Sequence, residues 1–187
     1  GLSLDGDELI HDSHRRDYKG TGSYKKAVLV LKKMQKYKIP HNILTVVNKT
    51  NVKKAEKIYT HFKKLNIKYM QFIPLVNNSY KKPKNRNENL ISNLSITGAE
   101  YGDFLIKLFD LWIKDFGDIY IQIFAETLNA YFSAAANLCI FSKICGRSLV
   151  IDHLGDLYSC DHFVEEKYKL GNIEHVSLFT FLLFSYD

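Results

Sequence analysis

Three cysteines have the clearest capacity for chemistry in this 187-residue chain. Five residues separate Cys139 from Cys145, and 14 separate Cys145 from Cys160. Asp161 and His162 follow the third cysteine directly. Thiolates so spaced can converge on one metal ion or iron–sulfur cluster, and four thiolates normally complete a cluster. The spacing alone leaves three interpretations open: partial ligation of a cluster, a zinc site that adds a histidine, or unrelated buried thiols.

Asp161 is a candidate general base, because a neighbouring ligand would hold its carboxylate close to the site. An isolated aspartate after a hairpin is more often a turn or capping residue, so that interpretation also stays open. Asp152 and Asp156 fall within an expected hairpin turn, and we interpret both as turn formers.

A second group of polar residues follows the first expected strand. Ser3 and Asp5 end the apolar start of the chain, and Arg15 and Arg16 lie in the next connection. Parallel barrels bind ligands at this edge of their strands. An arginine there could hold a carboxylate through two parallel hydrogen bonds, although solvated loop arginines are more common.

The first part of the chain alternates strands and helices. Continuous apolar runs predict strands, and apolar residues at helical spacing predict helices. The expected strands cover 1–4, 42–47 and 68–74, and the expected helices cover 24–39 and 52–65. A polar loop should run up to Ser23, the expected N-cap, and the second strand should be buried on both faces. This order predicts right-handed βαβ units in a parallel sheet.

The character of the sequence changes near residue 137, where we place a domain boundary. Before it we expect a polar loop over 77–93, a helix that begins with the capping box Thr97–Glu100, a strand over 118–123 and a helix over 125–136. After it, the segment 148–160 alternates around a glycine turn and predicts a β-hairpin.

Composition and charge narrow the classes of protein. A hydrophobic content of 46% is enough for one core, or for one core with a small appendage. The net charge of +6 comes largely from dispersed lysines, which argues against a nucleic-acid-binding module. No run reaches the roughly 18 apolar residues of a membrane span, and no secretory leader is evident. We therefore expect a soluble, cytoplasmic protein that does not associate with a membrane; an odd number of cysteines suits that reducing compartment.

Both ends of the chain fall within apolar segments. It begins with Gly1 rather than Met, directly in an expected strand, and it stops at Asp187 just after an aromatic-rich stretch. We therefore expect an internal fragment of a longer protein.

Six short motifs occur in a specific order. They are Gly1-Leu-Ser-Leu-Asp-Gly6, Ile10-His-Asp12 with Arg15, Asn42-Ile-Leu-Thr-Val-Val47, Gln71-Phe-Ile-Pro74, Gly155-Asp-Leu-Tyr-Ser-Cys-Asp161 and Leu170-Gly-Asn-Ile173. Together they resemble the anaerobic sulfatase-maturating enzymes, a family of radical S-adenosylmethionine (SAM) proteins, over nearly the whole chain. The sharpest part of the resemblance is the cysteine spacing with Cys160-Asp161.

The resemblance implies an α/β fold with two parts. Residues 1–136 would be the C-terminal part of a (β/α)6 radical SAM barrel with a following helix and strand. Residues 137–187 would be the start of a SPASM-type domain, the appendage that carries auxiliary 4Fe-4S clusters. The implied cofactors are SAM and three 4Fe-4S clusters in the full-length protein, one of them partly ligated by this chain.

The matched positions imply a SAM site. Ser3 would contact the ribose of SAM, Arg15 its carboxylate, and Val76 would line the site as an apolar residue. The chain lacks the Cys-x3-Cys-x2-Cys motif of the SAM cluster, the Gly-Gly-Glu-Pro strand and the cysteines of a second auxiliary cluster. By itself it is therefore expected to be inactive.

The resemblance also assigns roles around the cysteines. Cys139, Cys145 and Cys160 match three of the four ligands of the first auxiliary cluster, and Asp161 matches the general base. In the implied reaction, reductive cleavage of SAM gives a 5'-deoxyadenosyl radical, which removes a Cβ hydrogen from a sulfatase Cys or Ser. Asp161 takes the thiol or hydroxyl proton, and an auxiliary cluster accepts the remaining electron. A Ser target then gives formylglycine directly, whereas a Cys target gives a thioaldehyde whose hydrolysis leaves formylglycine. The implied partners are a sulfatase polypeptide and an electron donor such as flavodoxin or ferredoxin.

Two alternative functions stay open. Another radical SAM enzyme of the SPASM group, acting on a different peptide, would share the barrel and the clusters without needing Asp161 as a base. A basic, zinc-containing nucleic-acid-binding protein is less expected, because the lysines are dispersed.

Overall fold

The computed structural model describes residues 1–76, 93–132, 138–142 and 148–175. The chain divides into two compact units, Gly1–Ala125 and Glu126–Asp187. The expected boundary near residue 137 stays a prediction. No helix in the described part of the chain has both the length and the apolar character needed to cross a membrane.

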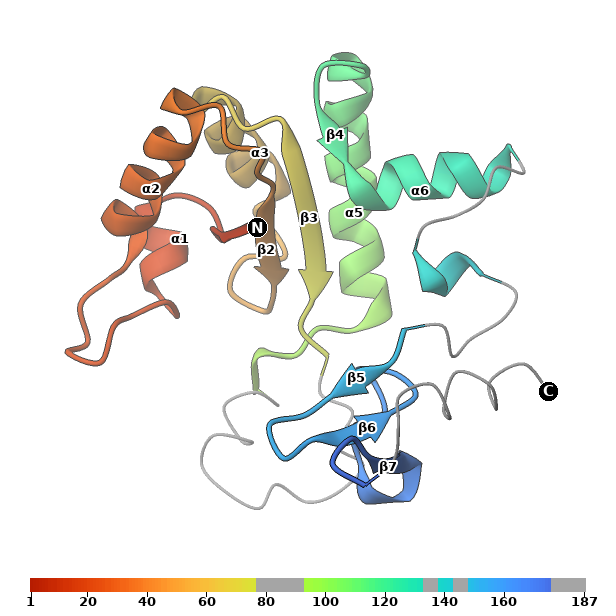
Figure 1. Cartoon of the computed structure of the whole chain (residues 1–187). Helices are drawn as coiled ribbons and strands as arrows, with labels where there is room; N and C mark the ends of the chain where they lie inside the picture. The colour runs from red at the N-terminus through yellow and green to blue at the C-terminus, as the bar shows by residue number, and fades with distance from the viewer. Residues whose placement is uncertain (77–92, 133–137, 143–147, 176–187) are drawn as a thin grey trace. The chain divides into compact units, whose positions relative to one another are not determined.

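The first unit contains a four-stranded parallel sheet in the order β1-β2-β3-β4, with helices in the connections (Figure 1). This arrangement confirms the α/β class and the parallel pairing expected from the alternating pattern. The strands are β1 (Leu2–Ser3), β2 (Ile43–Val47), β3 (Tyr69–Pro74) and β4 (Tyr120–Ile121). The helices are α1 (Glu8–Asp12), α2 (Tyr24–Lys36), α3 (Ala55–Lys64), α5 (Gly98–Trp112) and the 3₁₀ turn η1 (Ile113–Asp115).

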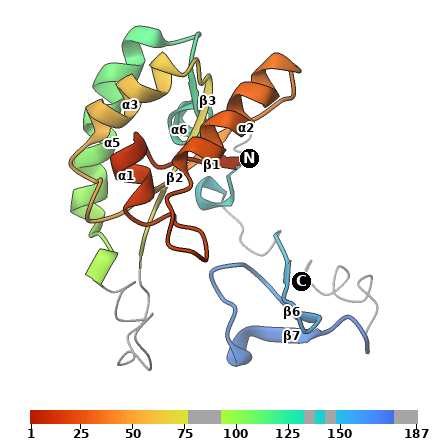
Figure 2. The ribbon, with the colours of Figure 1, turned by 90° about the vertical axis from the view of Figure 1, so that its left-hand side faces the viewer.

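The two faces of the sheet differ in burial. One face packs on α3 and α5: the ring of Phe72 lies 6.5 Å from Phe62 of α3 and 5.5 Å from Phe104 of α5. Figure 2 shows these two helices together on one side of the strands. On the other face, Leu44 is only partly buried and Ile73 is exposed. The expectation that β2 is buried on both faces is therefore wrong: its residues alternate between buried and partly exposed.

The connection between β1 and α2 differs from the loop expected there. It contains the short helix α1, whose N-cap Asp7 accepts a hydrogen bond from the backbone of Ile10. Ser23 precedes α2 as expected, but its side chain does not cap the helix. The carboxylate of Asp12, 12 residues away in the sequence, accepts the hydrogen bond from the backbone N–H of Tyr24 instead, at 2.9 Å. A contact from a distant residue therefore replaces the local cap.

The strand expected over 118–123 is shorter than its apolar run suggests. β4 is only two residues long, and helix α6 (Gln122–Tyr131) begins directly after it and ends before the predicted limit of 136. The indole of Trp112 donates to the carbonyl oxygen of Ile119 at 2.8 Å, and the Phe124 ring packs 5.1 Å from Trp112. Ile121 and Phe124 are both buried at helical spacing, so packing on Trp112 favours the helix over a longer strand.

The second unit is built on a three-stranded antiparallel sheet in the order β5-β6-β7. β5 (Val150–Ile151) and β6 (Asp156–Tyr158) form the hairpin predicted from the sequence. β7 (Lys169–Asn172) was not predicted. Two 3₁₀ turns, η2 (Cys139–Phe141) and η3 (Glu166–Tyr168), complete the described elements of this unit.

The capping box at the start of α5 is present as predicted. The Thr97 hydroxyl accepts from the Glu100 backbone N–H at 3.2 Å, and the Glu100 carboxylate accepts from the Thr97 backbone N–H at 2.8 Å. Replacing Thr97 with Ala should lower the free energy of unfolding by about 1 kcal/mol, because backbone donors of the first turn lose their partner. Urea denaturation followed by the fluorescence of Trp112, the sole tryptophan, measures this change. Thr97→Ser should retain most of the stability, and an unchanged midpoint in Thr97→Ala would contradict the cap.

The same carboxylate makes an ion pair whose effect depends on pH. Lys49 lies 2.6 Å from Glu100, and this contact and the capping hydrogen bonds lower the pKa of Glu100 to about 2. Because the unfolded pKa is roughly 4.3, the ionised carboxylate stabilises the fold above that value, and this contribution is lost as the pH falls toward about 2. Glu100→Gln, which keeps a capping side chain, should be less stable than wild type at pH 6 but equal to it near pH 2. A stability difference that stayed constant from pH 6 to pH 2 would contradict this assignment.

Candidate functional site

The carboxyl ends of the parallel strands bring separate segments of the first unit to one edge. Asp5 follows β1, Asn48 follows β2, and Val76 comes two residues after β3. In the sheet register, Ser3 pairs with Leu44 on the partly exposed face, and the Ser3 residue is exposed. Of the residues that the resemblance assigned to a SAM site, Ser3 thus lies on this face and Val76 follows the edge of the sheet.

Arg15 is engaged by an acidic partner that the sequence did not identify. Its Nε and Nη2 atoms donate to the two carboxylate oxygens of Asp5, and the backbone N–H of Val46 donates to the same carboxylate at 3.0 Å. The Asp5 side chain is 7% exposed and the Arg15 side chain is 31% exposed. The pair is therefore anchored on its acidic side and open to solvent on its basic side.

His11 and Ser23 close a ring of hydrogen bonds around this pair. The backbone N–H of Asp5 donates to His11 Nδ1 at 3.2 Å, and His11 Nε2 lies 3.0 Å from Ser23 Oγ. Ser23 Oγ in turn donates to the backbone carbonyl oxygen of Arg15 at 2.9 Å. Burial lowers the pKa of His11, which favours the neutral ring needed for Nδ1 to accept. The hydroxyl expected to cap α2 is thus used to fix the backbone of Arg15.

Val76 is exposed and ends the described part of the β3 connection. The preceding residue, Leu75, donates its backbone N–H to the carbonyl oxygen of Val47 at 2.8 Å, which continues the pairing of β3 with β2 to the strand ends. The role of Val76 as an apolar residue lining a SAM site stays a prediction.

Cys160 lies at the end of the β5–β6 hairpin in the second unit. It is 8% exposed, and its sulfur accepts the backbone N–H of His162 and donates to Asp161 Oδ1, at 3.4 and 3.3 Å. His162 Nδ1 lies 2.9 Å from the same carboxylate oxygen, and the Asp161 side chain is 73% exposed. The hydrogen bond from the Cys160 thiol, together with the nearby His162, keeps the pKa of Asp161 below its usual value. An ionised, accessible carboxylate therefore lies against a buried thiol.

Cys139 belongs to the turn η2 and is exposed, whereas Cys145 lies outside the described residues. A sulfur that accepts a backbone N–H, as Cys160 does, suits a thiolate ligand of an iron–sulfur cluster, because such hydrogen bonds tune the cluster. The ligand atoms of Cys160, Asp161 and His162 also lie within 4.8 Å of one another, which suits a single metal ion. The donor set fits either group.

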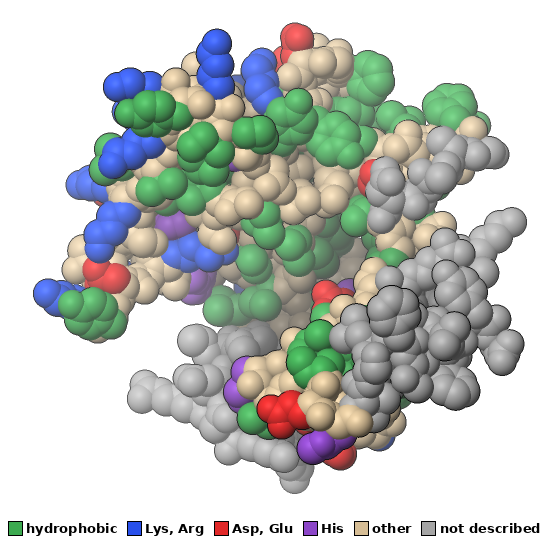
Figure 3. Space-filling model, viewed as in Figure 1, with side chains coloured by type: hydrophobic (Ala, Val, Ile, Leu, Met, Phe, Trp, Pro, Cys, Tyr) green, Lys and Arg blue, Asp and Glu red, His purple; other side chains and the backbone are tan. Residues whose placement is uncertain are grey.

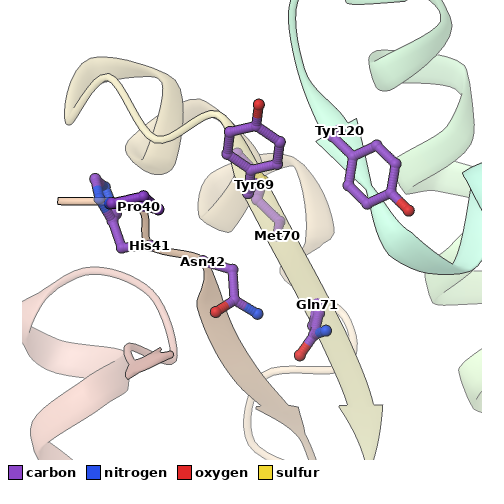
Figure 4. Close-up of a pocket in the computed structure, with 7 residues that line it drawn as sticks. All are labelled: Pro40, His41, Asn42, Tyr69, Met70, Gln71 and Tyr120. Atoms are coloured by element: carbon purple, nitrogen blue, oxygen red, sulfur yellow. The ribbon is translucent and has the colours of Figure 1, made fainter. Parts of the chain in front are cut away.

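A hollow of about 380 Å³ lies at the opposite, amino ends of the strands (Figure 4). The rings of Tyr69 and Tyr120, which are 5.9 Å apart, line it, as do the amides of Asn42, which directly precedes β2, and of Gln71 on β3. No acidic or cysteine side chain lines it among the described residues. Parallel α/β folds place their chemistry at the carboxyl ends of the strands, so this hollow is not our candidate site.

The sequence placed Asp5 at the ligand-binding edge, but it did not predict that Asp5, His11 and Ser23 contact Arg15. The available signal was an acidic residue directly after a buried strand, with a histidine and an arginine six and ten residues later. That spacing does not reveal that all three converge, because the connection first has to fold into α1.

No family model matches the chain. It is 34% identical over 182 residues to the serine-type anaerobic sulfatase-maturating enzyme of Bacteroides thetaiotaomicron, covering 92% of this chain and 44% of that protein. It is 37% identical over 177 residues to the cysteine-type enzyme of Clostridium novyi, covering 93% and 46%. The chain is homologous to the anaerobic sulfatase-maturating enzymes. It spans less than half the length of these curated relatives.

Solved structures of the same family agree with this relationship. The structure described as native anSMEcpe with bound AdoMet has a TM-score of 0.81 and 30% identity, and the match covers 95% of this chain and 48% of that one. A second structure, with bound AdoMet and the Cp18Cys peptide, has a TM-score of 0.72. The similarity to the maturating enzymes thus extends from sequence to fold.

The different exposure of two cysteines gives a test of the second unit. In the folded chain without metal, iodoacetamide should alkylate Cys139 at least about tenfold faster than Cys160, because Cys160 is buried and hydrogen-bonded. Peptide mapping by mass spectrometry at several times measures both rates. The two rates should converge in denaturant, and equal rates in the folded chain would contradict the burial of Cys160.

Proposed function

We propose that this chain is part of a radical SAM maturase that oxidises an active-site Cys or Ser of a sulfatase to formylglycine. The observation that carries the proposal is that 92–95% of the chain aligns with maturating enzymes of both types. The proposal is also supported by the position of Val76 after the carboxyl end of β3 and by the contact of Arg15 with Asp5, which follows β1. The substrate would be a sulfatase polypeptide, and flavodoxin or ferredoxin would supply electrons.

For the fold, the proposal is a partial (β/α)6 barrel followed by the start of a SPASM domain. A barrel is supported by the parallel sheet with one face on α3 and α5 and the other partly exposed, because the inner face of a barrel closes only when all strands are present. The small antiparallel sheet, with Cys160 two residues after β6, supports a separate cluster-binding unit.

In the proposed SAM site, Ser3 contacts the ribose, Arg15 binds the carboxylate and Val76 provides an apolar wall. SAM and its cluster, when bound, supply the radical chemistry, which protein side chains do not provide. This chain's residues hold and orient the cofactor. The exposed hydroxyl of Ser3 and the solvent-facing side of Arg15 suit those roles.

In the second unit, Cys139, Cys145 and Cys160 are the proposed ligands of the first auxiliary 4Fe-4S cluster, and the fourth is not assigned. Asp161 is the proposed general base. An aspartate carboxylate is ionised at neutral pH and can accept the thiol or hydroxyl proton of the target residue. The exposure of Asp161 leaves room for an incoming peptide.

A zinc site is the second candidate for the cysteine region, and it is favoured by one observation, the close approach of the ligand atoms of Cys160, Asp161 and His162. Nucleic-acid binding gains no such support. Lysines gather over α2 in Figure 3, but two of them are paired with carboxylates, Lys25 with Glu8 and Lys26 with Asp17. The remaining alternative is a SPASM-type enzyme that modifies a different peptide. It would differ from the proposed maturase only in its substrate.

The test is anaerobic reconstitution of the full-length protein with iron and sulfide, followed by incubation with SAM, reductant and a sulfatase-motif peptide. Mass spectrometry should detect formylglycine, and 5'-deoxyadenosine should be released. SAM cleavage without formylglycine would move the substrate to another peptide. Absence of both a cluster and SAM cleavage would favour the zinc site.

Asp161→Asn tests the proposed base in the same assay. Formylglycine formation should fall by at least about a hundredfold, while the cluster content and the affinity for SAM stay unchanged. Asp152→Asn is the matched control, because Asp152 accepts hydrogen bonds only within the hairpin turn among the described residues. Full activity of Asp161→Asn would remove this residue from the mechanism.

A further inference from the structure

The hydrogen bonds around Arg15 divide its guanidinium into two edges. A guanidinium has five N–H groups, and Asp5 accepts one from Nε and one from Nη2. Among the described residues, no side chain or carbonyl accepts a hydrogen bond from Nη1. Arg15 is 31% exposed while Asp5 is 7% exposed, so solvent reaches the arginine and not the carboxylate that holds it.

The orientation of Asp5 is itself fixed from two sides. Its carboxylate accepts the backbone N–H of Val46 on β2, and its own backbone N–H donates to the buried ring of His11. His11 contacts Ser23, which donates to the carbonyl oxygen of Arg15. Side chain and backbone of Arg15 are therefore held by the same closed ring. If one residue of this ring were replaced, the Arg15 side chain could adopt more than one orientation.

We propose that Asp5 is a positioning residue for the cofactor: it binds the Nε edge of Arg15 and thereby directs the outer edge at the carboxylate of SAM. His11 and Ser23 hold Asp5 and Arg15 in place relative to each other. This inference rests on the proposed function and adds residues that do not touch the cofactor. A planar guanidinium can pair with two carboxylates at once, one on each edge, and fixing the first pair reduces the entropy lost when the second forms.

Loss of Asp5 should weaken binding of SAM through its carboxylate. Asp5→Asn keeps the shape of the side chain but places an amide against the guanidinium, so Arg15 should no longer be held in one orientation. The dissociation constant for SAM should rise about tenfold. Decarboxylated SAM, which has no carboxylate for Arg15, should bind wild type and variant equally. A merely structural defect would weaken both ligands together.

The experiment is equilibrium dialysis of the reconstituted full-length protein against SAM and against decarboxylated SAM. Wild type, Asp5→Asn, Arg15→Ala and the double variant should be compared, with Asp17→Asn as control. Asp17 lies in the same connection but pairs with Lys26 at the surface. We expect Asp5→Asn and Arg15→Ala to lose the preference for SAM, the double variant to lose no more than Arg15→Ala, and the control to keep it.

Ser23→Ala gives a second route if Asp5→Asn does not fold. It removes one hydroxyl from the ring and should reduce the preference for SAM about threefold, with circular dichroism confirming the fold. An unchanged preference in folded Asp5→Asn or Ser23→Ala would overturn the positioning role while leaving the maturase function intact. If wild type bound neither ligand, both the positioning role and the proposed function would fail.

Discussion

The burial of the Asp5 carboxylate is the constraint on which the first unit's candidate site depends. A buried charge is tolerated only when it is paired and hydrogen-bonded. Asp5 meets this condition with Arg15 and with the backbone of Val46, which belongs to a neighbouring strand. One carboxylate therefore ties the end of β1 to β2 and to the connection before α2. The same contacts that make its burial possible also give Arg15 its direction.

The apolar packing of the sheet supplies the frame for this pair. Aromatic rings from α3, β3 and α5 form a continuous buried layer on one face, and the indole of Trp112 fixes the chain before β4. Because successive side chains of a strand point to opposite faces, burial of one set leaves Ser3, Leu44 and Ile73 on the other. The proposed cofactor site uses that second face. The alternation of side chains along the strands thus produces both the buried core on one face and the exposed face of the proposed site.

Elements with strong local signals could be predicted from the sequence. The strand at β2, the helix α3 and the capping box of α5 depend on residues within a few positions of one another. The short β4 and the use of Ser23 could not be predicted, because contacts with Trp112 and with His11 and Arg15 decide them. Helix α1 was missed because its five residues are too few to show a helical apolar pattern. In the site, the cysteine spacing and Asp161 were recognisable, and Cys145 lies outside the described residues. The pairing of Asp5 with Arg15 was missed because one helix brings them together.

The central claim is that the carboxyl edge of the first unit binds SAM through an arginine fixed by Asp5. An anaerobic crystal structure of the full-length protein with SAM tests it most directly. The account predicts that the outer edge of Arg15 lies within hydrogen-bond distance of the SAM carboxylate while Asp5 still accepts from Nε. SAM bound away from this edge, or an Arg15 that leaves Asp5 to reach the cofactor, would contradict it.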